Sequence, residues 1–347
     1  MNEPVNAPLK ALAKSALRGT AAIFGPHRWR RGPCLLVLTY HRVLPEGHPD
    51  RASEQPGMLV SPELLKMHLE VLAEHFTFVH LDDWLRAAAA GSPPPGRSLA
   101  LTFDDGWRDT CDHAFPVLEQ AGAPATVFLV TDMVGTSYSF WPNRLARLLA
   151  GWQPAQAQRL DERTRGRMEH LGIPLDLRPE QATPEVIDRI IGRCKVTSDA
   201  DMRAMLDHVE TLVRGAPQDR PRDLLDWHEV RHMAESGLVR FGSHTRRHTR
   251  LLEGLDAELL QDEVAGSRRV LEEKLGQPAP LFCYPNGDCS PAAYAAVKVT
   301  YEGAVTTRGG WHDPTQDPYL VHRVGIHEDV ARTPTATLAR TAQWPGL

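Results

Sequence analysis

The apolar positions of this chain fall into two alternating patterns, short continuous runs and longer stretches with helical spacing. Continuous runs rich in β-forming residues occupy 33–43, 98–106 and 124–130, and each is typical of a buried strand. Residues 61–75, which begin with the N-cap serine Ser61, and residues 113–122 have the spacing of amphipathic helices. This alternation of strand and helix predicts a parallel sheet or barrel.

The pattern changes between residues 136 and 225, where helical spacing dominates and no core strand is predicted. Strands alternate with helices again from residue 226, ending in a strand-like run at 319–326. We therefore expect an α/β barrel interrupted by a helical insertion. The predicted parts are an N-terminal segment (1–32), a split barrel (33–135 and 226–330), the insertion (136–225) and a C-terminal tail (331–347).

The N-terminal segment is basic. Lys10, Lys14 and Arg18 follow one helical stripe, and Arg28, Arg30 and Arg31 come after it. Two interpretations stay open: a helix packed on the domain, or a basic amphipathic helix that contacts an anionic membrane through residues 9–31. The segment lacks the uninterrupted apolar stretch of a signal peptide or a membrane span.

Composition narrows the class of protein. The 347 residues are 42% hydrophobic, which is enough for a full core, and the net charge of −5 gives no general case for nucleic-acid binding. The five cysteines are an odd set without a CxxC pair, which argues against a disulfide framework and fits a reducing compartment. We expect a cytoplasmic protein, either free or peripheral on the inner face of the membrane.

Two motifs carry candidate chemistry, and both follow apolar strands. The first, ALTFDDG, ends in Asp104 and Asp105, and the second, FGSHTRRHT, contains His244 and His248. Each motif is weak alone, because DDG often begins a turn and the chain has 16 histidines. Together they offer two imidazoles and a carboxylate, a common ligand set for catalytic zinc, at the strand ends where α/β folds build their sites.

TFDDG followed by HTRRH resembles the polysaccharide deacetylase family, also called the NodB-homology or carbohydrate esterase 4 family, over roughly residues 33–135 and 226–330. The resemblance implies a distorted (β/α) barrel with one divalent metal. Asp105, His244 and His248 would hold the metal, and Asp104 would be the general base. Zn²⁺ fits this set best, although Co²⁺ and Ni²⁺ would also bind.

The same resemblance implies the removal of N-acetyl groups from an amino-sugar-containing bacterial glycan or glycan precursor, as in surface polysaccharide biosynthesis. Two alternatives stay open. One is a deformylase or deacetylase of a lipid-linked sugar at the membrane surface, and the other is a non-catalytic glycan-binding protein on the same fold.

A third family motif corresponds loosely to LFCYPNGD. The backbone N–H of Asn286 would bind the oxyanion, with Tyr284 and Pro285 as substrate contacts, although the segment also fits a plain turn. Cys283 stands where many family members carry an arginine that orients the base. What orients Asp104 is therefore left open.

The family usually supplies its general acid from an LxxH motif late in the chain. Here that motif is Leu38-Thr39-Tyr40-His41, at the end of the first predicted strand, as in members that resemble a circular permutation. We expect His41 to be the acid, with His327 as the second candidate. The alternative interpretation is that His41 has only a structural role, as a histidine at the end of a strand that hydrogen-bonds to the backbone.

Three further residues are candidate substrate contacts, each with a structural alternative. Trp107 would form a wall of the cleft. Trp227 would line an acetyl or sugar pocket, unless it packs a helix on the barrel. Arg247 would meet an acidic group of the substrate, unless it is simply solvated.

Overall fold

The computed structural model describes residues 16–214 and 221–343. The chain divides into two compact units. The first comprises residues up to 45, 60–136 and 224 onward, and the second comprises 46–59 and 137–223.

The first unit is built on a parallel sheet of eight strands in the order β10-β1-β5-β6-β7-β8-β9, with β4 paired to β5. The strands of the described chain are β1 (Cys34–Tyr40), β2 (Arg42–Val43), β3 (Leu59–Val60), β4 (Thr77–Phe78), β5 (Arg97–Phe103), β6 (Ala125–Leu129), β7 (Val239–Ser243), β8 (Leu281–Cys283), β9 (Gly303–Val305) and β10 (Val324–Gly325).

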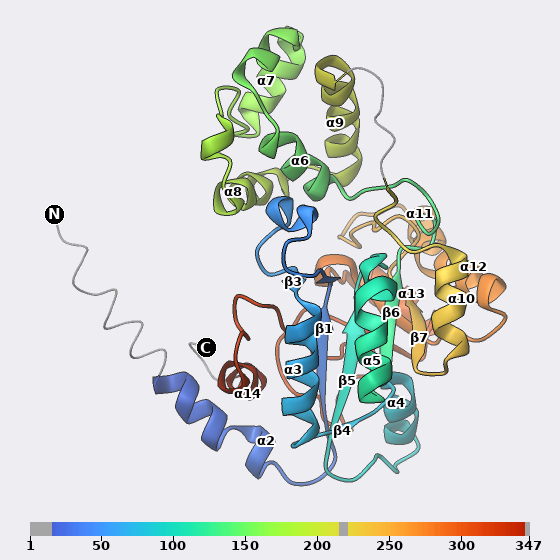
Figure 1. Cartoon of the computed structure of the whole chain (residues 1–347). Helices are drawn as coiled ribbons and strands as arrows, with labels where there is room; N and C mark the ends of the chain where they lie inside the picture. The colour runs from blue at the N-terminus through green and yellow to red at the C-terminus, as the bar shows by residue number, and fades with distance from the viewer. Residues whose placement is uncertain (1–15, 215–220, 344–347) are drawn as a thin grey trace. The chain divides into compact units, whose positions relative to one another are not determined.

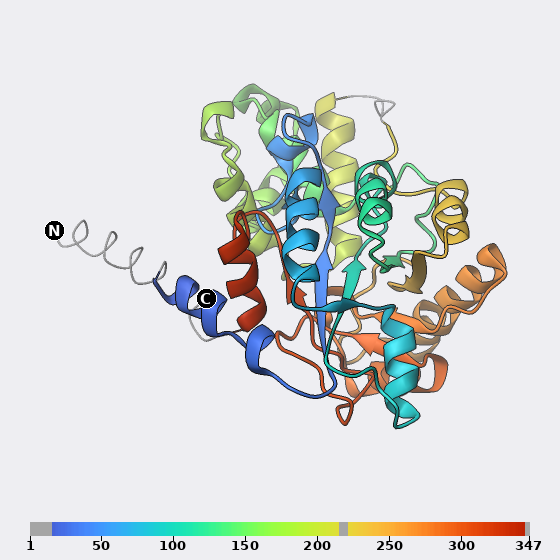
Figure 2. The same ribbon diagram turned by 60° about the horizontal axis from the view of Figure 1, so that its bottom comes forward.

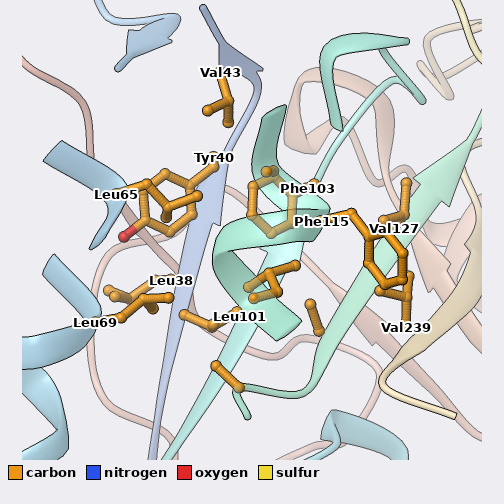
Figure 3. Packing of buried hydrophobic residues seen from close by; sticks show 14 of the residues in the cluster. Leu38, Tyr40, Val43, Leu65, Leu69, Leu101, Phe103, Phe115, Val127 and Val239 are labelled. Atoms are coloured by element: carbon orange, nitrogen blue, oxygen red, sulfur yellow. The ribbon is translucent and has the colours of Figure 1, made fainter. Parts of the chain in front are cut away.

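The two faces of this sheet bury different side chains, because successive residues of a strand point to opposite faces. One face carries large apolar residues that pack under helices α3 (Pro62–Ala73) and α5 (Phe115–Ala121) (Figure 1). Figure 3 shows this core, with Leu38 and Tyr40 of β1 and Leu101 and Phe103 of β5 meeting α3 and α5. The opposite face of these two strands carries Leu35, Val37 and Ala100, and α4 (Leu81–Ala89) packs against their cluster.

The segment before and within β10 brings the two edges of the sheet together. Val321 forms a parallel bridge with Val305 at the end of β9. A few residues later, Val324 pairs with Leu38 of β1. The sheet is therefore curled, and the expected α/β class with a distorted (β/α) barrel is confirmed. The first and last strands of this sheet in chain order, β1 and β10, are therefore neighbours.

Helices surround the sheet. The predicted helix at 61–75 is α3, and the Ser61 hydroxyl accepts a hydrogen bond from the N–H of Leu64, as an N-cap does. The expected C-terminal tail contains a helix, α14 (Pro334–Ala342), which packs against α2 (Pro26–Trp29) and α3. The remaining named helices of the first unit are α10 (Trp227–Glu235), α11 (Ala257–Gln261), α12 (Ser267–Leu275) and α13 (Pro291–Thr300).

The described part of the N-terminal segment is helical over residues 16–24 and in α2. Ala21 packs with Ala339 and Ala342 of α14, and the ring of His27 is buried. Figure 2 shows the described N-terminal helical residues beside α14. The predicted basic stripe includes Lys10 and Lys14, which lie outside the described residues. Over 16–214 and 221–343, every helix is too short or too polar to cross a membrane.

The second unit has its own hydrophobic core. Its helices are amphipathic, and their buried faces meet in a cluster that includes Leu145, Trp152, Ile191 and Leu206. The helices are α6 (Trp141–Ala150), α7 (Glu162–His170), α8 (Pro184–Cys194) and α9 (Asp199–Arg214).

Candidate metal centre and catalytic site

The two acids of the first motif lie where β5 ends. Asp104 continues the alternation of the strand and lies on the same face as Ala100 and Thr102, and its N–H donates to the carbonyl of Tyr40. Asp105 then adopts a left-handed conformation with φ of 74°, as does Gly106. A Cβ on Gly106 would lie 2.7 Å from the side chain of Leu129, so this turn requires glycine. The turn separates the two carboxylates, and both are buried.

Asp105 meets both histidines of the second motif. Its Oδ1 lies 3.5 Å from Nε2 of His244 and 3.6 Å from Nε2 of His248. His244 follows β7, and its Nδ1 donates to the carbonyl of Cys283 at 2.8 Å. That hydrogen bond fixes the ring so that Nε2 faces Asp105. One carboxylate oxygen and two imidazole nitrogens therefore converge, all within 4.8 Å of one another.

This donor set suits a divalent ion such as Zn²⁺. Among the described residues a second group of donors is Asp104, His244 and Cys283. Asp104 already binds a guanidinium, which would repel a cation, so we regard Asp105, His244 and His248 as the better metal site.

Side chains behind the ligands hold them in place. The indole N–H of Trp107 donates to Oδ2 of Asp105 at 3.0 Å, which leaves Oδ1 facing the two imidazoles. The guanidinium of Arg42 lies 4.1 Å from the Trp107 ring centre and pairs with the buried carboxylate of Asp109 at 2.6 Å. The sequence predicts that Trp107 forms a wall of the cleft. The side chain is instead 1% exposed and supports Asp105 from inside the unit.

The loop between the two histidines is fixed by a carboxylate. Glu263 lies in a π-helical turn (Asp262–Gly266) and is fully buried. Its Oε2 accepts hydrogen bonds from the backbone N–H groups of Arg246 and Arg247, at 2.9 and 3.0 Å. The loop can therefore hold the left-handed conformation of His248, whose φ is 61°.

Arg247 is bound within this network. Its guanidinium pairs with Glu263, Asp262 and Asp132 at 2.8, 2.8 and 3.5 Å. Three carboxylates thus neutralise the side chain that was expected either to meet an acidic substrate group or to be simply solvated.

Asp104 is oriented by a residue that the sequence motifs did not indicate. Arg323, one position before β10, donates from Nη1 to Oδ1 and from Nη2 to Oδ2 of Asp104, both at 2.7 Å. The Arg323 side chain is 1% exposed. Burial by itself raises the pKa of the Asp104 carboxyl, but the guanidinium outweighs burial and holds that pKa below its usual value.

The other donors of Arg323 are also satisfied. Its Nε donates to the carbonyl of Thr306, and its Nη1 lies 3.1 Å from the hydroxyls of both Thr39 and Thr102. Nη2 lies 3.2 Å from Sγ of Cys283. Many family members carry an arginine at the position of Cys283. Here Arg323 binds the Asp104 carboxylate instead, from the residue just before β10.

The two candidate acids lie on the same side of the sheet as Asp104. Nε2 of His41 is 4.0 Å from Oδ2 of Asp104, and the His41 side chain is 27% exposed. His327 follows β10, and its Nδ1 lies 3.1 Å from a carboxylate oxygen of Asp329. Burial lowers the pKa of His327, and the nearby His41 lowers it further. The first and last strands therefore place His41 beside Asp104, and His327 lies near His41.

The third motif forms a tight turn after β8. Asn286 is exposed and left-handed, with φ of 55°, and Gly287 donates back to the carbonyl of Tyr284 at 2.9 Å. Tyr284 and Pro285 are buried, contrary to the expectation of substrate contact. Trp227 is half-buried and packs against the main core cluster, which agrees with its structural alternative.

Comparison with known proteins connects this geometry to one family. A family model described as polysaccharide deacetylase matches residues 91–166 and 180–303. YxkH of Bacillus subtilis (strain 168), whose name assigns it to the polysaccharide deacetylases, is 31% identical over 234 residues, which cover 67% of this chain and 53% of YxkH. The poly-β-1,6-N-acetyl-D-glucosamine N-deacetylase of Staphylococcus epidermidis is 30% identical over 110 residues, covering 29% of this chain and 38% of that protein.

The fold is shared with a solved structure, that of the Streptococcus pyogenes deacetylase PplD in complex with acetate. The TM-score is 0.58 at 17% sequence identity, and the match covers 90% of this chain and all of PplD. The chain spans about half or less of the length of the two curated relatives it matches.

Proposed function

We infer an N-deacetylase activity from a family relationship: the chain belongs to the polysaccharide deacetylase family, whose model matches more than half of it. The proposed reaction is hydrolysis of the N-acetyl group of an amino sugar in a bacterial glycan, which yields acetate and a free amine. One observation carries this proposal. A buried aspartate, held by an arginine, lies directly beside a converging set of two imidazoles and one carboxylate.

Asp105, His244 and His248 would hold one divalent ion, for which Zn²⁺ is the first choice. When bound, the ion would polarise the acetamide carbonyl and make water more acidic. The chain's own contribution is orientation, because Trp107 fixes Asp105 and the Cys283 carbonyl fixes His244.

Asp104 is proposed as the general base. Arg323 keeps its carboxylate ionised, so it can accept a proton from water. The two hydrogen bonds also restrict the carboxylate to a single orientation, which lowers the cost of reaching the transition state.

His41 is proposed as the general acid that protonates the leaving amine. Its imidazole is partly exposed and lies 4.0 Å from Asp104, so base and acid can act on the same bond from neighbouring positions. The backbone N–H of Asn286 would bind the oxyanion that forms at the carbonyl.

The substrate class is proposed from the relatives. The Staphylococcus epidermidis relative is named for poly-β-1,6-N-acetyl-D-glucosamine, so N-acetylglucosamine oligomers are the first substrate to test. A sugar on a lipid carrier is the second candidate, because the N-terminal helical segment exposes apolar and basic side chains together. The non-catalytic alternative was supported only by the absence of an arginine at position 283. Because Arg323 binds Asp104, that support is removed.

The test is to incubate the purified chain with N-acetylglucosamine oligomers and with lipid-linked N-acetyl and N-formyl sugars, and to measure acetate and formate. We expect acetate release that stops with a chelator and returns with Zn²⁺, Co²⁺ or Ni²⁺. Formate without acetate would indicate the deformylase. Failure to release either product from any of these substrates, with metal present, would contradict the proposed activity.

A further inference from the structure

The N-terminal helical segment carries an exposed apolar patch next to arginines. Ile23, Phe24 and Trp29 are 57%, 63% and 62% exposed. Among the described residues the large hydrophobic side chains with comparable exposure are only Val196, Leu252 and Val299, and these are scattered through the chain. We propose that this N-terminal patch, defined by Ile23, Phe24, Trp29, Arg28 and Arg31, docks on the surface of an anionic lipid bilayer.

The apolar residues form one contiguous surface. Ile23 and Phe24 are adjacent in sequence, and the indole N–H of Trp29 donates to the carbonyl of Phe24 at 2.9 Å. The Trp29 ring is therefore held against the end of the helix that carries the other two side chains. Exposed aromatic side chains of this kind suit the boundary between lipid headgroups and acyl chains.

The charges carried by the N-terminal segment itself have one sign. No Asp or Glu occurs between residues 4 and 45, although the whole chain has a net charge of −5. Arg28 and Arg31 are exposed beside the patch. Arg30 pairs with Asp313 of the same unit and so contributes little net charge. A cationic patch on an acidic protein would attract anionic headgroups and leave the rest of the surface repelled.

The patch is held firmly to the barrel unit. The ring of His27 is fully buried and bonds to the carbonyl of Ala22, while Ala21 packs against α14. Arg97 of β5 donates to the carbonyl of Arg30. These contacts bury one side of the segment and leave Ile23, Phe24 and Trp29 on the outside. Their exposure is therefore a property of the folded unit.

A second copy of the chain is a poorer occupant than lipid. A symmetric dimer through this face would bring the arginines of both copies together without an acidic partner from the same segment. An anionic bilayer, in contrast, has both an apolar interior for the three hydrophobic side chains and negatively charged headgroups for the arginines. The inference concerns where the protein is held and does not depend on which carrier bears the sugar.

The experiment is co-sedimentation of the full chain with phosphatidylcholine vesicles that contain or lack phosphatidylglycerol. We expect binding to the anionic vesicles that weakens as salt is raised, because salt screens the arginines. Phe24→Ser/Trp29→Ser should reduce the partition coefficient by about tenfold or more, since it removes the two aromatic side chains that enter the boundary. Arg28→Gln/Arg31→Gln should remove the preference for anionic lipid.

Leu252→Ser/Val299→Ser is the matched control, because it removes two exposed apolar residues elsewhere on the same unit. It should bind vesicles like the wild type, and melting temperatures should show that all variants are folded. Equal binding by the wild type and the aromatic variant, or no binding by either, would overturn the proposal. So would a wild-type dimer that the aromatic variant converts to a monomer. Acetate release from soluble oligomers should be unchanged in the patch variants, which separates this test from that of the proposed function.

Discussion

Both oxygens of the Asp104 carboxylate accept hydrogen bonds from Arg323, each at 2.7 Å, although the two residues are 219 positions apart in the chain. The pair is buried, and Thr39, Thr102 and the Thr306 carbonyl use the remaining donors of the guanidinium. A buried ion pair with its hydrogen bonds complete is costly to break from one side, since the remaining charge loses its partner.

Arg323→Met should therefore lower turnover by about 100-fold or more, because the base loses its orientation. It should also lower the free energy of unfolding by about 3–5 kcal/mol, since Asp104 stays buried without a partner. Metal content by elemental analysis should be unchanged. Arg240→Met is the control, because Arg240 is a half-exposed arginine on β7 that pairs with Asp82 and Asp83.

The Cys283 thiol touches the same guanidinium, so position 283 offers a second route to Asp104. Arg323→Met/Cys283→Arg should recover part of the lost turnover, since an arginine from β8 can approach the carboxylate from that side. Full activity in Arg323→Met alone would show that the pair has no part in catalysis.

The candidate metal ligands could be brought together from the sequence because their two motifs follow β5 and β7. The carboxyl ends of parallel strands in one sheet meet at the same edge, so TFDDG and HTRRH could be placed together from local pattern alone. Arg323 could not be placed in this way, because its contact with Asp104 depends on how the sheet curls and brings β10 beside β1. One signal was present, namely an arginine within the apolar run 319–326, since a charge in a buried strand needs a partner.

The burial of two aromatic residues at the site could not be predicted from the sequence either. Trp107 and Tyr284 were expected to contact substrate, because they flank motif residues in the chain. Both side chains are instead buried in the unit, at 1% and 0% exposure. A similar limit applies to residues 46–59, whose contacts place them with the second unit, although they precede it by some 80 positions.

Asp104→Asn should abolish acetate release and leave the metal bound. The amide cannot accept the proton from water, whereas Asp105, His244 and His248 are unaltered. His244→Ala should instead lose the metal, because it removes one of three ligands. Elemental analysis of both purified variants separates the two roles. Strong residual turnover in Asp104→Asn would rule out this aspartate as the base.

His41→Ala should lower turnover by about 100-fold or more and retain the metal, because the leaving amine loses its proton donor. His327→Ala is the matched comparison, since His327 lies near His41 but pairs with Asp329. We expect a smaller loss there. A substrate with a better leaving group should recover activity in His41→Ala, as removal of an acid predicts. If His327→Ala shows this behaviour and His41→Ala does not, the assignment of the acid is reversed.

Stability should fall in mild acid because of His68, a buried residue of α3. Its Nε2 donates to the carbonyl of Ala331 at 2.6 Å, and its Nδ1 accepts from the Tyr40 hydroxyl at 3.3 Å, so both ring nitrogens are satisfied in the neutral form. Burial lowers the pKa of His68 from its usual 6.5 to about 4. Between these two values the unfolded chain binds a proton that the folded chain does not. The free energy of unfolding should therefore decrease by about 1.4 kcal/mol per pH unit from this residue as the pH falls from 6.5 toward 4.

His68→Gln removes the titrating group and can still donate to the Ala331 carbonyl. Urea unfolding at pH 7 and pH 5 should show a loss of stability that is about 2 kcal/mol smaller in this variant than in the wild type. The exposed His170 provides the control substitution, His170→Gln, which should keep the wild-type loss. Other buried histidines, such as His27 and His312, add to the acid sensitivity of every variant equally, so only the difference between variants reports on His68. An equal loss in His68→Gln and the wild type would mean that His68 is protonated in the folded chain, against the neutral form that its two hydrogen bonds require.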